Sequence, residues 1–139
     1  MFKIASTHDD LIKVYIVRGI VFIDEQKCPY SLEIDEHEHS SLHILGEDES
    51  GEPYAAARIR FFGDYAKLER IAIRKEWRGT GLGLELVEYM VSVAEKRGFR
   101  KYKMHAQSHL QSFYGKLGFK PHGDLFDEAG IEHITMIKE

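Results

Sequence analysis

Apolar residues recur along the chain with two different periods, and each period predicts a different kind of element. Helical spacing runs over residues 8–23, where Thr7 offers an N-cap and acidic side chains occupy the first turn. The same spacing returns over residues 82–97, which Gly98 ends, and over the shorter segment 110–117. The pattern therefore predicts two amphipathic helices and one short helix.

Strand patterns lie between and around these helices. Short runs of alternating or continuous apolar residues predict strands over residues 2–5, 41–46, 54–62, 66–73, 99–106, 119–122 and 131–137. Helices interspersed among hairpins predict an α/β (α+β) protein, with a mixed, mostly antiparallel central sheet of about seven strands and helices on both faces. The polar segment 24–40 reads as a loop with at most one helical turn.

Composition places the chain among ordinary globular proteins. Its 139 residues, of which 43% are hydrophobic and 30% charged, can bury a core without disulfide or metal support. The only cysteine, Cys28, cannot form an internal disulfide, and no apolar run approaches the roughly 20 residues of a membrane span. We expect a single domain over residues 1–139, located in the cytoplasm and without a membrane partner.

The net charge of −4 conceals two regions of opposite sign. Residues 24–52 hold ten acidic side chains against Lys27 alone, whereas residues 71–120 hold ten basic and four acidic side chains. This division suits a protein that binds an anionic ligand at one place and a cationic ligand at another. The alternative is an acidic loop that only keeps the surface solvated. No dense basic run exists, so a nucleic-acid partner is not expected.

The most specific pattern is the glycine-rich turn Arg78-Gly79-Thr80-Gly81-Leu82-Gly83, between a predicted strand and the helix over residues 82–97. Backbone N–H groups at a helix N-terminus, unshielded by side chains, bind phosphate groups. The glycine spacing differs from the dinucleotide fingerprint, and the chain has no GxxxxGK[ST] run. The turn therefore indicates a pyrophosphate site of another type.

The turn and a second segment resemble the motifs of the GNAT acyltransferases. Arg78–Gly83 is similar to the R/Q-x-x-G-x-G/A acetyl-CoA signature of that family, and the run Phe113-Tyr114-Gly115-Lys116-Leu117-Gly118-Phe119 resembles its second motif. Further segments resemble the small bacterial YjcF-like branch. These are residues 21–26, Pro29, residues 33–36 and residues 128–136. The resemblance covers nearly the whole chain and implies the GNAT fold and an acetyl-CoA-dependent N-acetyltransferase.

The resemblance also implies where acetyl-CoA, the co-substrate, would bind. Its pyrophosphate would lie on the backbone amides of the glycine turn. Its pantetheine arm would lie along the preceding strand, where the next strand splays away. The implied cofactor-binding residues are Ile71, Ala72, Ile73, Arg78, Gly79, Thr80, Gly81, Leu82, Gly83, Leu84 and Lys116. The basic region gains a purpose, because coenzyme A also carries a 3′-phosphate, for which Lys116, Arg74 and Lys75 are candidates.

Acetyl transfer to an amine needs a group that accepts a proton and a group that assists the leaving thiolate. By resemblance, Tyr114 is the general acid near the sulfur of coenzyme A. Its spacing beside Phe113 and Leu117 fits a packed core aromatic equally well. The resemblance therefore decides in favour of the catalytic role.

The base has several candidates. Strict alternation along the strand over residues 66–73 places Glu69 on the face of Ile71 and Ile73, where it would face the acceptor. The opposite face would hold Leu68, Arg70 and Ala72. Glu69 is our first choice; the alternative for it is an ion pair with Arg58 or Arg60 on the neighbouring strand. His105 and His133 are further candidates with a suitable ordinary pKa.

The acceptor is expected to be a primary amine of a small molecule or a protein amino group. The acidic, histidine-containing loop over residues 33–39 would form a wall of the acceptor site, where its carboxylates either attract a cationic amine or are solvated. Its ligand types also suit zinc, but no second cluster completes a set, and we expect no metal. An acyl-CoA sensor with little catalysis is the alternative function. Either a monomer or a homodimer is compatible with the sequence.

Overall fold

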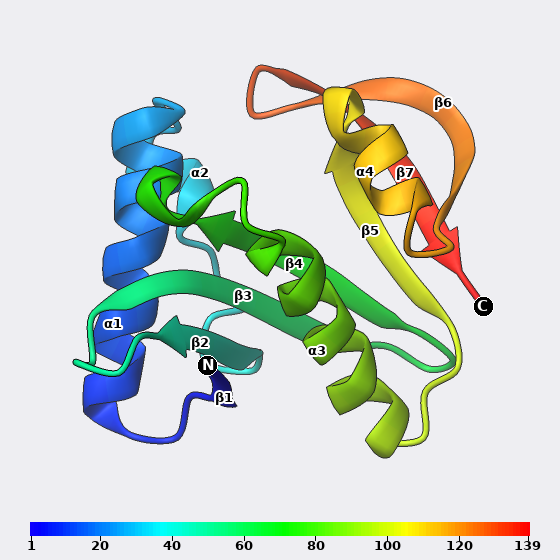
Figure 1. Ribbon diagram of the computed structural model, residues 1–139. Helices are drawn as coiled ribbons and strands as arrows, with labels where there is room; N and C mark the ends of the chain where they lie inside the picture. The colour runs from blue at the N-terminus through cyan, green and yellow to red at the C-terminus, as the bar shows by residue number, and fades with distance from the viewer.

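The computed structural model describes residues 1–139 and arranges them around one seven-stranded sheet with the strand order β1-β2-β3-β4-β5-β7-β6 (Figure 1). The strands are β1 (Phe2–Ile4), β2 (Leu42–Glu47), β3 (Pro53–Phe61), β4 (Ala66–Ile73), β5 (Tyr102–Gln107), β6 (Lys120–Glu128) and β7 (Ile131–Lys138). The helices are α1 (His8–Arg18), η1 (Gly19–Glu25), α2 (Tyr30–Glu33), η2 (Lys75–Trp77), α3 (Leu82–Lys96), η3 (Ser108–Leu110) and α4 (Gln111–Gly115). Neighbouring strands are antiparallel except β4 and β5, which are parallel.

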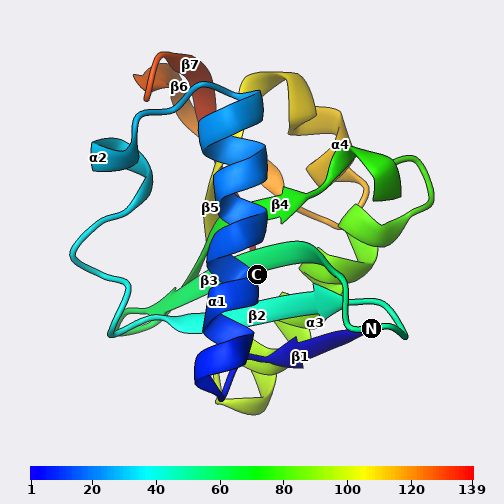
Figure 2. The same ribbon diagram turned by 90° about the vertical axis from the view of Figure 1, so that its left-hand side faces the viewer.

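Helices α1 and α3 cover opposite faces of the sheet, as Figures 1 and 2 show. On one face, Leu86 and Met90 of α3 join a cluster that includes Leu68 of β4. On the other face, Val14 of α1 packs in a smaller cluster with Ala72 of β4. The mixed sheet with helices on both faces agrees with the sequence-based prediction. None of the helices combines the length and apolar character that a membrane crossing requires.

The first predicted helix ends earlier than its apolar pattern suggested. Thr7 and Asp10 form a capping box at its N-terminus, as the N-cap residue predicted. After Arg18 the chain continues as η1, whose wider π-helical turns carry it to Glu25. Apolar spacing alone does not distinguish the two helix types, because both keep an apolar face toward the sheet.

The C-terminal hairpin is longer than predicted. Strand β6 extends over residues 120–128, whereas the pattern indicated only 119–122. Most of its residues are exposed and polar, so it carries no alternation that a sequence pattern could reveal. The register with β7 shifts between His122 and Phe126, which further obscures the strand.

A β-bulge interrupts β4. Between the pairs Arg58–Glu69 and Ala56–Ala72, β4 has one residue more than β3. Arg70 lies in this segment with a φ of +54°, in the left-handed region that favours glycine. Side chains beyond the bulge therefore lie on the opposite face of the sheet from the one that regular alternation would give them.

The bulge overturns the predicted division of faces. Ile71 and Ile73 pack with Leu68 against the α3 cluster, whereas alternation placed Leu68 on the face opposite the two isoleucines. Glu69 lies beside Arg58, on the face covered by α1 and α2. Alternation fails here because one extra residue inverts the order of side chains along a strand.

Strands β4 and β5 pair only where they begin. Their parallel pairs are Ala66–Tyr102 and Lys67–Lys103, and beyond these the two strands diverge (Figure 1). The second half of β4 therefore has β3 on one side and no strand on the other. This is the splay that the resemblance implied.

Two buried arginines, Arg18 at the end of α1 and Arg58 on β3, hold the segment around α2 in place. Arg18, 0% exposed, donates to Glu33 at 2.9 Å and to both carboxylate oxygens of Glu38 at 2.8 Å. Arg58, 1% exposed, donates from both terminal nitrogens to Asp35 at 2.8 and 3.0 Å. The segment is held by buried ion pairs rather than by regular structure.

Arg18→Met should lower the free energy of unfolding by about 3–5 kcal/mol, because it removes the closest cation from two buried carboxylates, Glu33 and Glu38. Urea denaturation followed by circular dichroism measures the change. The matched control is Lys13→Met on the same helix, which removes a partly exposed ion pair with Glu47 and should cost less than about 1 kcal/mol. Equal losses in the two variants would show that the buried network is not a principal source of stability.

Candidate active site

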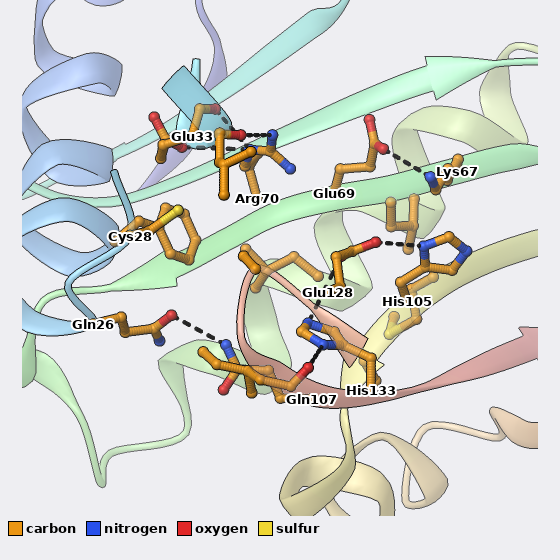
Figure 3. Close-up of a pocket in the computed structure, with 18 of the residues that line it drawn as sticks. Gln26, Cys28, Glu33, Lys67, Glu69, Arg70, His105, Gln107, Glu128 and His133 are labelled. Atoms are coloured by element: carbon orange, nitrogen blue, oxygen red, sulfur yellow. Dashed lines mark hydrogen bonds and ion pairs between the residues drawn. The ribbon is translucent and has the colours of Figure 1, made fainter. Parts of the chain in front are cut away.

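A cavity of about 460 Å³ opens where β4 and β5 separate. Figure 3 shows Glu33, Arg70, Glu69 and Lys67 on one side of it and His105, Gln107, Glu128 and His133 on the other. Gln107 donates a hydrogen bond to Gln26 at 3.1 Å, which links β5 to the residue after η1. The three residues predicted to be catalytic, Tyr114, Glu69 and His133, all line this cavity.

The glycine turn leads into α3 with its backbone uncovered. Gly79 and Gly81 have φ values of +83° and +86°, and Gly81 is the N-cap of the helix. A Cβ atom at either position would meet no atom within 4 Å, so these glycines are required by their backbone conformation rather than by crowding. A Cβ at Gly83 would lie 3.1 Å from Phe113. The turn thus presents open amides at the positive end of α3.

Arg78, predicted to bind the cofactor, has its side chain occupied by protein groups. Its terminal nitrogens donate to both oxygens of Glu25 at 2.6 and 2.8 Å, and its Nε donates to the carbonyl of Ile73 at 2.8 Å. Arg78 therefore ties the glycine turn to η1 and to the end of β4. By contrast, Lys116 and Lys75 are exposed and take part in no ion pair.

The free edge of β4 has amide groups available for a ligand. The N–H of Arg74 donates to Tyr54 of β3, and alternate residues of a strand direct their amides to opposite sides. The amides of Ile71 and Ile73 therefore face the splay, whereas those of Ala72 face β3. Of the three β4 residues predicted to contact the cofactor, the two isoleucines have the suitable orientation.

Tyr114 on α4 is both a packed aromatic and a residue of the cavity. Its side chain is 6% exposed and packs edge-on against Phe113 and Phe119. Burial raises the pKa of Tyr114 to about 12, and its hydroxyl makes no hydrogen bond within the protein. The hydroxyl therefore stays protonated at neutral pH and keeps its donor free for a ligand.

Glu69 has the ion pairs that formed the alternative to a catalytic role. It binds Arg58 at 2.9 Å and Lys67 at 3.0 Å, with Arg60 at 3.6 Å. Burial by itself would raise the pKa of Glu69, but the charges of Arg58 and Lys67 outweigh burial and hold the pKa below its ordinary value. A carboxylate held in its ionised form by three cations is a weak proton acceptor.

His133 has one ring nitrogen fixed and the other directed to a carboxylate. Its Nδ1 lies 2.7 Å from the carbonyl of Ile131, and a carbonyl only accepts, so Nδ1 carries the proton. Its Nε2 lies 3.7 Å from Glu128, whose other oxygen is 3.1 Å from Nδ1 of His105. The hydrogen bond to His105, with both histidines nearby, lowers the pKa of Glu128. Sequence reasoning missed Glu128, because only the β6–β7 hairpin brings it to the two histidines.

The acidic loop lines the cavity as expected, through Glu33, Asp35 and His37. Its carboxylates, however, are turned onto Arg18, Arg58 and Arg70 rather than presented as free charges. No group of three or more His, Cys, Asp or Glu side chains in the structure is arranged to hold a metal ion.

The sequence of residues 19–139 matches the family model described as an acetyltransferase (GNAT) domain. The chain belongs to the GNAT acetyltransferase family. It is 35% identical over 137 residues to the uncharacterized N-acetyltransferase YjcF of Bacillus subtilis, an alignment that covers 98% of this chain and 97% of that protein. The predicted family and its YjcF-like branch are confirmed.

Solved structures share the GNAT fold. Escherichia coli ElaA is 28% identical and superposes with a TM-score of 0.90, covering 100% of this chain and 99% of that one. A GNAT acetyltransferase from Elizabethkingia anophelis with acetyl-CoA bound has a TM-score of 0.78 at 14% identity, covering 100% and 97%. This GNAT protein is an N-acetyltransferase whose co-substrate is acetyl-CoA.

Gly81→Ala should lower the free energy of unfolding by about 1–2 kcal/mol, because alanine is strained at a φ of +86°. Denaturation in urea measures the loss. Gly19→Ala is the control, since Gly19 has a right-handed φ of −62° and open space around it, and it should be neutral or slightly stabilising. A Gly81→Ala protein as stable as the control would contradict the conformational argument.

Proposed function

We propose that this GNAT protein transfers the acetyl group of acetyl-CoA to a primary amine of a small molecule by direct attack. The observation that carries the proposal is the splay between β4 and β5, which opens a cavity lined by Ile71 of β4, the strand whose end Arg78 ties to the glycine turn. Tyr114 of α4 and His133 of β7 both line that cavity. The position of the cavity fits a thioester that enters along β4 and an amine that enters from the opposite end of the cavity.

The cofactor contacts follow from the available backbone groups. The amides of Gly79 to Leu84 would hold the pyrophosphate, and the amides of Ile71 and Ile73 would pair with pantetheine like an added strand. Lys116, exposed and unpaired, is the candidate for the 3′-phosphate. Arg78 acts as a positioning residue, since its side chain bonds to Glu25 and Ile73.

Tyr114 would assist the leaving group. The amine nitrogen attacks the thioester carbon, and the C–S bond breaks with its electron pair on sulfur. A thiol has an ordinary pKa of about 8.5, so the thiolate needs only a hydrogen-bond donor to leave readily. The unshared hydroxyl of Tyr114 can be that donor.

His133 is a better base than Glu69, the first choice from sequence. The proton that the amine loses would pass to Nε2 of His133, since Nδ1 is already protonated. The nearby carboxylate of Glu128 stabilises the imidazolium that forms. Glu69 is held ionised by Arg58 and Lys67, which suits a structural role.

The direct test measures thiol release from acetyl-CoA with a panel of small amines, in parallel with calorimetry of acetyl-CoA binding. The wild type should release thiol only when an acceptor is present. Tyr114→Phe should lower kcat about tenfold or more while leaving the Kd for acetyl-CoA and the unfolding free energy nearly unchanged. Equal losses of binding and turnover would make Tyr114 structural. Tight binding without acceptor-dependent turnover would favour the alternative of an acyl-CoA sensor.

The choice of base is tested by the pair of variants His133→Gln and Glu69→Gln. His133→Gln should lower kcat/KM at neutral pH by about 100-fold while leaving the Kd for acetyl-CoA and the free energy of unfolding nearly unchanged. Glu69→Gln should mainly lower stability, because it unbalances buried Arg58. If Glu69→Gln instead causes the loss of about 100-fold and His133→Gln has little effect, Glu69 is the base.

A cytoplasmic location remains a prediction, which the use of acetyl-CoA supports. Whether the protein is a monomer or a homodimer also remains a prediction.

A further inference from the structure

The acidic segment leaves little charge for a cationic acceptor. Glu33 and Glu38 accept hydrogen bonds from Arg18, and Asp35 accepts from Arg58, which also forms an ion pair with Glu38. One carboxylate oxygen, Oε2 of Glu33, has no partner, but it is sealed from solvent. The wall that looks acidic in sequence is neutralised by arginines buried behind it.

The same wall presents cations to the cavity. Arg60, Lys67 and Arg70 line it, with side chains 18–22% exposed. Arg60 and Lys67 share with Arg58 the single carboxylate of Glu69, so the cations here outnumber their partner. Nε of Arg70 donates to the carbonyl of Glu33 and lies near its carboxylate. Nη2 donates to the carbonyl of Leu32 and to the carboxylate of Asp35, and Nη1 has no partner. Figure 3 shows a terminal nitrogen of Arg70 on the side away from Glu33. Donor capacity therefore remains on this side of the cavity.

The backbone of Arg70 gives independent evidence that its side chain is needed there. A φ of +54° costs free energy for arginine, and glycine would avoid that cost at a bulge. The bulge also places Arg70 against α2 and in the cavity at the same time.

The opposite wall carries the reverse charge. Glu128, between His105 and His133, has its pKa lowered by its hydrogen bond to His105 and so stays ionised. An ammonium group is attracted to this side, next to the base proposed above. The cavity therefore has a cationic wall on β3 and β4 and, opposite it, the carboxylate of Glu128 at the end of β6.

We infer that the acceptor is a primary amine that also carries an anionic group, as an amino acid or an aminoalkyl phosphate does. The anionic group lies against Arg70, with Arg60 and Lys67 contributing charge, while the amine lies at His133 and Glu128. This inference rests on the proposed function, because it assigns the acceptor to the same cavity.

The test compares kcat/KM, by thiol release, for acceptors that differ only in the anionic group. The probes are the standard L-amino acids against their amides, O-phosphoethanolamine against ethanolamine, and 1,4-diaminobutane as a purely cationic amine. At least one anionic member should exceed its neutral partner by about tenfold or more. The amino acid and phosphate pairs distinguish a carboxylate from a phosphate.

Variants identify the residue responsible for the preference, which is the ratio of kcat/KM for an anionic acceptor to kcat/KM for its neutral partner. Arg70→Met should reduce this ratio toward one, mainly by raising KM for the anionic acceptor, and Arg70→Lys should restore part of it. Lys13→Met, far from the cavity on α1, should leave the preference unchanged. If Arg70→Met does not fold, Arg60→Met tests the same inference, and it should also reduce the preference for the anionic acceptor.

Efficient acetylation of the amides or the diamine, with no advantage for the anionic partners, overturns the inference and leaves the proposed function standing. A preference that survives both Arg70→Met and Arg60→Met also overturns the cationic wall as its source. No turnover of any amine, with acetyl-CoA bound, overturns the proposed function and the inference with it.

Discussion

Arg18 and Arg58 lie in the interior, and the position of the α2 segment depends on their ion pairs. A guanidinium without solvent contact must find carboxylates in good geometry, since an unpaired buried charge is far more costly than a lost surface contact. The chain supplies Glu33, Asp35 and Glu38 for this purpose. The requirement folds a loop that has almost no regular structure onto the protein, and that loop then becomes a wall of the candidate active-site cavity.

A second constraint acts on β4, which must stop pairing with β5 while it continues to pair with β3. On the side of β3 it continues to pair as far as Ile73, whereas on the side of β5 it pairs only through Ala66 and Lys67. The bulge at Arg70 lies in the part of β4 that does not pair with β5, and it places Glu69 and Arg70 on the face of the α2 segment. One strand thus has free amides on the side where we propose that the thioester lies and charged side chains in the wall of the cavity.

Much of the fold was readable from the sequence, because amphipathic periods and glycine punctuation are local signals. The helix over residues 82–96 and the strand over 66–73 appeared nearly at their observed bounds. The length of β6 could not be predicted, because an exposed edge strand has no apolar face and therefore no alternating pattern in the sequence. The face of Glu69 was not readable either, because nothing in the letters around Arg70 marks an inserted residue.

The sequence by itself determined the family, the glycine turn and the presence of Tyr114 and His133, since each is carried by residues close together in the chain. Only the tertiary structure decided the electrostatics of the cavity. It paired the acids of residues 33–38 with arginines from α1, β3 and β4, and brought Glu128 to His105 and His133. Charge counted along a chain is not charge presented to a ligand, because ion pairs form between residues that only the fold brings together.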